Sequence, residues 1–225
     1  APALKLANTR AYGAHVVLYD RPGGENREAI GQQLAQEKGL TLIKPYDHPQ
    51  VMAGQGTCGL EIAEQALALG INEADVLVCC GGGGLTSGVA LACESAAPGM
   101  IVRPVEPDTS DDVCRSLQSG NREVNKGTPV SICDAIVTPS PGELTFPIIK
   151  RLCADGIAVS DNEAMQAVAV ALTRLKLVAE PGGAVALAAA LFKQEAIHHD
   201  TVICVISGGN ADPSTLIDSL TRYAN

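Results

Sequence analysis

The 225-residue sequence contains no Trp, only 3% aromatic residues and few basic residues for its size. Its 25 Asp and Glu residues outnumber its 16 Lys and Arg residues, which gives a net charge of −9. Nucleic acids and anionic membranes attract proteins in which Lys and Arg are clustered. We therefore expect neither a nucleic-acid partner nor a membrane partner.

Long apolar runs are also missing: no stretch is long enough to cross a bilayer, and no charged-then-apolar leader opens the sequence. The eight cysteines form no C-x-x-C pair, and most lie within apolar runs such as VLVCC and TVICVI. Such cysteines favour a reducing compartment over a disulfide framework. Because a hydrophobic content of 46% excludes a disordered tail, we expect a folded, cytoplasmic protein.

Short runs rich in Val, Ile and Leu alternate with helix-like runs along the chain. The expected strands are residues 15–19, 41–44, 76–80, 101–105 and 202–206. The expected helices are residues 26–38, 55–69, 85–96, 142–154, 161–178, 183–192 and 213–223, and Ser160 and Glu163 form a capping box before one of them. This alternation predicts the α/β class, with a parallel or mixed sheet flanked by helices. A loose stretch is expected between residues 107 and 141.

The strongest local motif is a run of four glycines, Gly81 to Gly84, between an expected strand and an expected helix. Consecutive glycines let several backbone N–H groups turn toward one point, and a helix N-terminus adds partial positive charge. Together they favour a phosphate site over a plain turn. The run is neither a G-x-G-x-x-G fingerprint nor a P-loop, because no G-K-[ST] follows it.

Two further motifs follow expected strands. The first is SGGN at 207–210, and the second is an acidic group that includes Glu106 and Asp112. In a parallel sheet the carboxyl ends of all strands meet at one edge, where open α/β sheets bind ligands. We therefore expect a phosphate cradle, a hydroxyl and a group of carboxylates along the same edge.

Six stretches of the sequence resemble fold-type II pyridoxal-phosphate enzymes, which are similar in fold to tryptophan synthase β, and specifically the threonine/serine dehydratase and serine racemase family. They are AGQGTCGLEI (53–62), GGGGL (81–85), VEPDTSDD (105–112), SICDAI (131–136), KLVAEPGGAVALAA (176–189) and SGGN (207–210). Their order and spacing match the family over essentially the whole chain. The resemblance implies pyridoxal 5′-phosphate as the cofactor and a small amino acid as the substrate.

The resemblance also implies roles for particular residues. The backbone that would hold the cofactor phosphate belongs to Gly81, Gly82, Gly83, Gly84 and Leu85. Ser207 would hydrogen-bond the pyridine nitrogen, and Asp134 and Ala135 would approach the cofactor and the substrate. Arg27 and Glu28 would form a charged pair at the mouth of the site.

A divalent-cation site is implied by the same resemblance. Glu106 and Asp112 would contribute carboxylates and Ser110 a carbonyl oxygen. An all-oxygen shell of this kind suits Mg²⁺, Mn²⁺ or Ca²⁺.

One part of the family's chemistry has no match here. The family carries its cofactor on a lysine within an S-F-K-x-R-G-A-like motif, and neither this motif nor the usual S-x-G-N-H segment occurs. The opening APALKLANTR matches the family just after those motifs, so we expect Lys5 to be a solvated helix lysine and roughly 100 upstream residues to be absent. Residues 1–50 would then be a partial small lobe, and residues 51–225 the large phosphate-binding lobe.

The leading hypothesis is that the parent protein is an ammonia-lyase that dehydrates L-threonine or L-serine to a 2-oxo acid and ammonia. This chain alone, lacking the lysine, is expected to be inactive. The alternatives are a serine racemase, a hydroxyaspartate dehydratase, and a non-catalytic fragment that binds pyridoxal phosphate or phosphate. A homodimer is possible, because members of the family often pair.

Overall fold

The computed structural model describes residues 3–20, 23–127 and 130–224, and it places four strands of this range in one sheet. The strands are β1 (Ala74–Cys79), β2 (Met100–Pro107), β3 (Ile157–Val159) and β4 (Val202–Val205), in the order β3-β2-β1-β4. All neighbouring pairs are parallel, and Val76 lies opposite Val102 on one side and Ile203 on the other. The predicted α/β class is confirmed, and the sheet is parallel rather than mixed.

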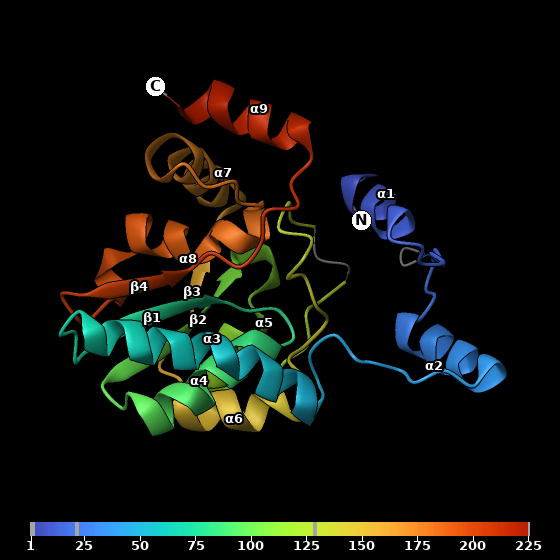
Figure 1. The fold of residues 1–225 in the computed structure, drawn as a ribbon, viewed down its shortest axis with the longest axis horizontal. Coiled ribbons are helices and arrows are strands. Elements are labelled where there is room, and N and C mark those ends of the chain that lie inside the picture. Colours follow the sequence, from blue (N-terminus) through green and yellow to red (C-terminus); the bar gives the residue numbers. More distant parts are fainter. Residues whose placement is uncertain (1–2, 21–22, 128–129, 225) are drawn as a thin grey trace.

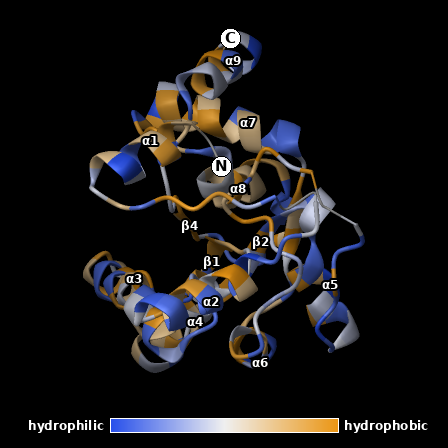
Figure 2. Ribbon diagram, turned by 90° about the vertical axis from the view of Figure 1, so that its right-hand side faces the viewer, coloured by the Kyte–Doolittle hydropathy of each residue, from blue (hydrophilic) through white to orange (hydrophobic). Residues whose placement is uncertain are grey.

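Helices cover both faces of the sheet (Figure 1). On one face, α4 (Gly84–Ala96) lies against β1 and β2, and α3 (Pro49–Ala68) and α6 (Thr145–Leu152) pack on α4. On the other face, α8 (Pro181–Phe192) lies against the strands, α7 (Asp161–Val170) packs on α8, and α9 (Pro213–Tyr223) packs on α7. Figure 2 shows the apolar strands between these layers. Every residue of β1 is buried, as expected for a strand covered on both sides.

The order of the strands creates a switch point at β1. The chain passes from β1 through α4 to β2, but it reaches β4, on the other side of β1, through α7 and α8 on the opposite face. Where connections diverge in this way, they leave a crevice at the carboxyl ends of the two strands. The crevice therefore falls where β1 ends at Cys79 and β4 ends at Val205.

The first part of the chain contains two helices that lie to one side of the sheet, α1 (Ala3–Ala11) and α2 (Arg27–Lys38), and neither buries a residue (Figure 1). Helix α2 confirms the expected helix at 26–38. Asn26 caps it by accepting hydrogen bonds from the amides of Glu28 and Ala29, at 2.9 and 3.1 Å. The division of the chain into two lobes at residue 50 stays a prediction.

The strands expected at 15–19 and 41–44 are wrong. Neither segment pairs with a strand of the described residues, and their apolar side chains are largely exposed, including Leu18 at 66% and Ile43 at 77%. A strand needs a partner for its backbone hydrogen bonds, and a short apolar run does not by itself supply one.

Other differences concern the ends of helices. The α-helix predicted over 161–178 ends at Val170 and continues as one π-helical turn, Ala171–Leu175, which stops at Lys176 with a φ of 61°. The loose stretch at 107–141 contains a helix, α5 (Asp112–Ser119), and β3 was too short to recognise. The capping box of Ser160 and Glu163 and the helix at 213–223 are confirmed. In the described part of the chain, we find no helix with the length and apolarity needed to span a membrane.

Candidate functional site

The glycine run lies at the carboxyl end of β1, where it turns directly into α4. Gly83 takes a φ of 91°, a conformation that residues with a Cβ rarely adopt, and the helix begins at Gly84. Among the described residues, no protein acceptor receives a hydrogen bond from the backbone N–H groups of Gly81, Gly82, Gly83, Gly84 and Leu85. A row of free donors at the positive end of a helix is suited to bind an anion.

The glycines also allow other segments to approach this backbone closely. A Cβ on Gly82 would collide with the ring of Tyr46, and a Cβ on Gly84 would lie 2.9 Å from the Tyr46 Cα. A Cβ on Gly81 would lie 2.9 Å from the carbonyl oxygen of Ile136. The run therefore fits between two loops that come from distant parts of the sequence.

A cavity of about 650 Å³ borders the glycine run. Its wall contains the whole run, Leu85, Cys79, Tyr46, and the segment from Asp134 to Thr138. The structure thus brings Asp134 and Ala135 to the same cavity as the predicted phosphate-binding residues. Their roles toward a cofactor stay predictions.

Arg27 and Glu28 occupy different positions around this cavity. Arg27, the first residue of α2, lines the glycine-bordered cavity and also a neighbouring cavity of about 550 Å³. Glu28 lines only the neighbouring cavity, together with Lys44 and Arg122. Arg27 therefore borders the same cavity as the glycine run and Glu28 does not, and their role as a charged pair stays a prediction.

Ser207 follows β4 and faces the end of β1. The Cys79 thiol donates a hydrogen bond to the Ser207 hydroxyl across 2.9 Å, and Cys79 lines the glycine-bordered cavity. Burial raises the pKa of the Cys79 thiol, so it keeps its proton at neutral pH and can act as the donor. Ser207 itself is exposed, but it is not among the residues that line the glycine-bordered cavity, so its role toward a cofactor stays a prediction.

Lys5 is not the solvated lysine that we expected. Its Nζ lies 2.7 Å from Glu180 Oε2 and 3.6 Å from Asp134 Oδ1, and its side chain is only 23% exposed. These two contacts connect α1 to the loop that contains Asp134 and to the N-terminus of α8. Among the described residues, no lysine lines the glycine-bordered cavity.

Glu180 is a candidate that motif analysis did not single out. It is 8% exposed, and its backbone N–H donates to the carbonyl of Gly208, directly after Ser207, at 2.9 Å. A Cβ on Gly208 would collide with Glu180 Oε1, so the carboxylate presses against the SGGN turn. Glu180 was visible in the AEPGG part of the family stretch. Nothing in the local sequence, however, distinguished it from an ordinary residue that precedes a helix.

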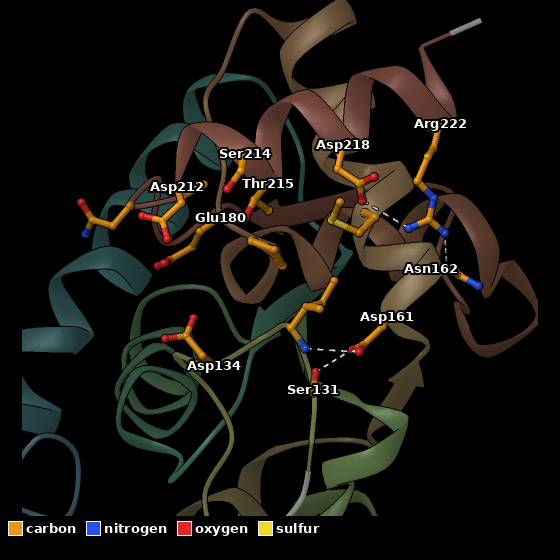
Figure 3. Close-up of a pocket in the computed structure, with 15 residues that line it drawn as sticks. Ser131, Asp134, Asp161, Asn162, Glu180, Asp212, Ser214, Thr215, Asp218 and Arg222 are labelled. Atoms are coloured by element: carbon orange, nitrogen blue, oxygen red, sulfur yellow. Dashed lines mark hydrogen bonds and ion pairs between the residues drawn. The ribbon is translucent and has the colours of Figure 1, made fainter. Parts of the chain in front are cut away.

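Glu180 and Asp134 also line a cavity of about 560 Å³ between α7 and α9 (Figure 3). Its wall is rich in carboxylates, and Arg222 binds two neighbours there, Asp218 at 3.3 Å and Asn162 at 3.1 Å. Asp161 accepts a hydrogen bond from the Ser131 hydroxyl at 2.6 Å. This cavity adjoins the glycine-bordered one through Asp134 but does not contain the glycine run.

The expected metal residues are buried together beside β2. Glu106 is fully buried and accepts hydrogen bonds from the amides of Val113 and Cys114, at 3.1 and 2.8 Å. Asp112 Oδ1 accepts from Asn125 at 2.6 Å, whereas its Oδ2 is buried without a partner among the described residues.

Burial, followed by the charge of Asp112, raises the pKa of Glu106 to about 8. Burial also raises the pKa of Asp112 to about 6. Ser110 lies within the same group and accepts a hydrogen bond from Asn125 at 2.9 Å. Among the described residues, no group of three or more His, Cys, Asp or Glu side chains is arranged to hold a metal ion. The expected site supplies only two carboxylates, so its occupancy stays a prediction.

A parallel sheet with an anion cradle at its switch point is typical of a ligand-binding α/β protein. Sequence comparison identifies the family to which this chain belongs. Residues 1–208 match the family model described as "Pyridoxal-phosphate dependent enzyme", and the chain belongs to this family. The family and the predicted fold type are thereby confirmed.

Individual relatives have related activities. The chain is 44% identical over 225 residues to an L-threo-3-hydroxyaspartate ammonia-lyase of Saccharomyces cerevisiae, covering 100% of this chain and 65% of the relative. It is 40% identical to a serine racemase of Schizosaccharomyces pombe, covering 100% and 66%. The solved structure of a threonine deaminase from T.th. superposes with a TM-score of 0.85 at 40% identity, covering 92% of this chain and 67% of that one. The chain thus spans about 65% of the length of the curated relatives named here.

Proposed function

We propose that this chain forms the phosphate-binding lobe of a pyridoxal-phosphate-dependent ammonia-lyase, which converts L-threonine or L-serine to a 2-oxo acid and ammonia. The observation that carries the proposal is the row of free amides from Gly81 to Leu85 at the N-terminus of α4. These donors fit a phosphate dianion, and the cavity beside them has room for a ring and a small substrate. The relatives, which include ammonia-lyases, support the reaction class.

In this arrangement the chain's own residues bind the cofactor and orient it. The five amides hold the phosphate, and the Ser207 hydroxyl donates to the pyridine nitrogen. The bound cofactor supplies an electron sink for the substrate's α-carbon. A hydroxyl, unlike a carboxylate, does not hold the nitrogen protonated, which weakens the sink and favours β-elimination. Ala135 and Asp134 border the space left for the substrate.

A second substrate, L-threo-3-hydroxyaspartate, is favoured by the position of Arg27. This cation lines both the glycine-bordered cavity and its neighbour, where a second carboxylate of a substrate could reach it. Serine racemization on the same site is a further alternative, because one relative is an L-threo-3-hydroxyaspartate ammonia-lyase and another is a serine racemase.

The lysine that carries the cofactor is proposed to come from outside this chain, since no lysine of the described residues lines the cavity. The chain alone should therefore show no absorption band typical of a lysine-bound cofactor, although it should still bind pyridoxal phosphate. The appearance of such a band in the isolated chain would contradict this part of the proposal.

A divalent cation is proposed at Glu106, Asp112 and the carbonyl of Ser110. The unpartnered, buried Oδ2 of Asp112 and the two buried carboxylates fit an oxygen-liganded Mg²⁺, Mn²⁺ or Ca²⁺. The ion would stabilise the loop between β2 and α5. If the site binds, Mg²⁺ should raise the melting temperature of the chain and should fail to do so in Glu106→Gln.

A cytoplasmic location and a homodimer are also proposed. All eight cysteines are free, which suits a reducing compartment. Light scattering of the purified protein tests the dimer, and fractionation of the producing cells tests the location.

The activity is tested on protein that carries this chain together with a lysine-bearing segment, such as that of the yeast relative. L-threonine, L-serine and L-threo-3-hydroxyaspartate are supplied separately, and 2-oxo acid and ammonia are measured. Chiral analysis of the remaining amino acid detects racemization. Cofactor binding without 2-oxo acid from any of the three substrates would contradict the lyase proposal.

A further inference from the structure

We propose that Thr145 and Asp47 are positioning residues for the phosphate site, which act by fixing the direction of the Gly82–Gly83 peptide. This inference rests on the proposed function, because it takes the amides after β1 to be the phosphate donors. Neither residue lies in the glycine run or lines the glycine-bordered cavity, although Asp47 lines the neighbouring one. Both therefore act on the phosphate site through the loop rather than by touching the phosphate.

Thr145 holds the carbonyl of Gly82. It is the first residue of α6 and is 0% exposed, and its Oγ1 donates to Gly82 O at 2.6 Å. The amide of Gly142 donates to the same oxygen at 3.1 Å. Two donors thus fix one carbonyl on the side of the loop that faces α6.

The direction of this carbonyl decides the direction of the next amide. A peptide unit is planar, and in the trans form its C=O and N–H point in opposite directions. No cis peptide occurs among the described residues. With Gly82 O directed toward Thr145, the N–H of Gly83 is directed away from α6, so it remains free for a ligand.

Asp47 fixes Thr145 in turn. Its Oδ1 accepts hydrogen bonds from the amides of Leu144 and Thr145, at 2.8 and 3.3 Å. A carboxylate in this position satisfies the free N–H groups of the first turn of α6 and offsets their positive charge. Tyr46, the residue before Asp47, packs on Gly82 and Gly84. The segment before α3 therefore affects the glycine run directly through Tyr46 and indirectly through Asp47 and Thr145.

The Thr145 hydroxyl also has little room to turn elsewhere. A Cβ on Gly83 would lie 2.9 Å from Thr145 Oγ1, and a Cβ on Gly142 would lie 2.7 Å from it. The hydroxyl is therefore lodged between two glycines and aimed at Gly82 O. A side chain that only filled space here would affect folding, but it would have no selective effect on a phosphate group.

That difference sets the experiment. Thr145→Val keeps the shape of the side chain and removes the hydroxyl, whereas Thr145→Ser is the matched control that keeps it. For both variants and the unchanged chain, calorimetry measures dissociation constants for pyridoxal 5′-phosphate, inorganic phosphate and unphosphorylated pyridoxal. Chains labelled with ¹⁵N-glycine report whether the Gly83 amide shifts when phosphate is added.

We expect Thr145→Val to bind pyridoxal phosphate and inorganic phosphate about ten-fold more weakly. The reason is that the Gly83 amide would no longer be held in a direction from which it can donate to the phosphate. Its affinity for pyridoxal should stay unchanged, and its Gly83 amide should lose the phosphate-induced shift. Thr145→Ser should behave like the unchanged chain. Equal phosphate affinity in Thr145→Val, or an equal loss for pyridoxal, would overturn the inference.

Asp47 provides a second route if Thr145→Val does not fold, because Asp47 is only half-buried. Asp47→Ala should weaken phosphate binding about three-fold, and Asp47→Asn, which keeps the capping oxygen, should restore it. Identical phosphate affinity in Asp47→Ala and the unchanged chain would count against the inference.

Failure of the proposed function would look different. An unchanged chain that binds neither pyridoxal phosphate nor inorganic phosphate would overturn both the phosphate site and this inference. An unchanged chain that binds both, with variants that bind equally well, would overturn only the role of Thr145 and Asp47.

Discussion

The polar groups at the two ends of the parallel strands differ in whether the protein supplies their hydrogen-bond partners. At the carboxyl end of β1, the described residues provide no acceptor for the five amides from Gly81 to Leu85. Near the amino end of β1, Asp75 is fully buried, and it accepts from Arg103 Nε and from the amides of His198 and His199, at 2.8 and 2.7 Å. A closed set of partners stabilises the fold, whereas open donors leave interactions for a ligand.

The largest expected effect comes from removing the charge of Asp75 near the amino end of β1. We call this the closed end, because both carboxylate oxygens of Asp75 have partners there, and the carboxyl end the open end. Asp75→Asn leaves the buried guanidinium of Arg103 without its counter-ion, which should lower the free energy of unfolding by about 3 kcal/mol. Urea unfolding measures the loss. The affinity for pyridoxal phosphate should stay within about two-fold of the unchanged chain, a difference of about 0.4 kcal/mol.

The exposed pair of Glu94 and Arg151 provides the control for Asp75. Glu94→Gln removes a similar ion pair at the surface, where solvent screens it, and should leave stability unchanged. A loss of cofactor affinity in Asp75→Asn as large as its loss of stability would show that the two ends are not independent.

At the open end, Gly83→Ala should weaken binding of pyridoxal phosphate by about 100-fold, or about 2.7 kcal/mol. The new Cβ would sit at a φ of 91°, 2.9 Å from Thr145 Oγ1, and would force the loop to rearrange. Calorimetric titration measures this. Gly70→Ala is the matched control, since Gly70 has a φ of 72° with nothing within 4 Å of its added Cβ.

Gly70→Ala should therefore show the backbone strain alone, about 1 kcal/mol of stability, with no change in cofactor affinity. If both alanine variants lose affinity equally, the glycine run has no special part in binding.

Apart from the two controls, the smallest expected effect is a loss of stability at acid pH, which arises at Asp75. Burial tends to raise the pKa of Asp75, but the hydrogen bonds from Arg103, His199 and His198 outweigh it and lower the pKa from 3.8 to about 2. A carboxyl with a lowered pKa stabilises the fold above its unfolded pKa, and the contribution is lost as the pH falls through its folded pKa. The chain should lose about 2 kcal/mol between pH 4 and pH 2.

Urea unfolding across this pH range measures the loss, and Asp75→Asn should remove most of it. An unchanged slope in Asp75→Asn would assign the acid sensitivity to other carboxyl groups.

The parts of the fold that the sequence predicted well are those whose character is local. The runs that became β1, β2 and β4 are rich in apolar residues, and helices cover both faces of the sheet that they form. The segments at 15–19 and 41–44 have the same apolar character and still form no strand, because strand formation depends on a neighbour that the local pattern does not reveal.

The same distinction holds for the site. The glycine run was visible because phosphate binding by backbone needs consecutive residues. Tyr46, Asp47 and Thr145 were not, because Tyr46 and Thr145 contact the run from distant segments and Asp47 acts on it only through Thr145. Lys5 was misjudged for the same reason, since its partner Glu180 lies 175 positions away in the numbering of the chain.

The central claim, that the amides after β1 bind a phosphate, is tested most directly by titrating the ¹⁵N-labelled chain with inorganic phosphate and then with pyridoxal phosphate. We expect the amide resonances of Gly81, Gly82, Gly83, Gly84 and Leu85 to shift together with one dissociation constant, while those of Asp75, His198 and His199 stay in place. Binding that leaves the five amides unmoved, or that moves the closed end instead, would contradict the account.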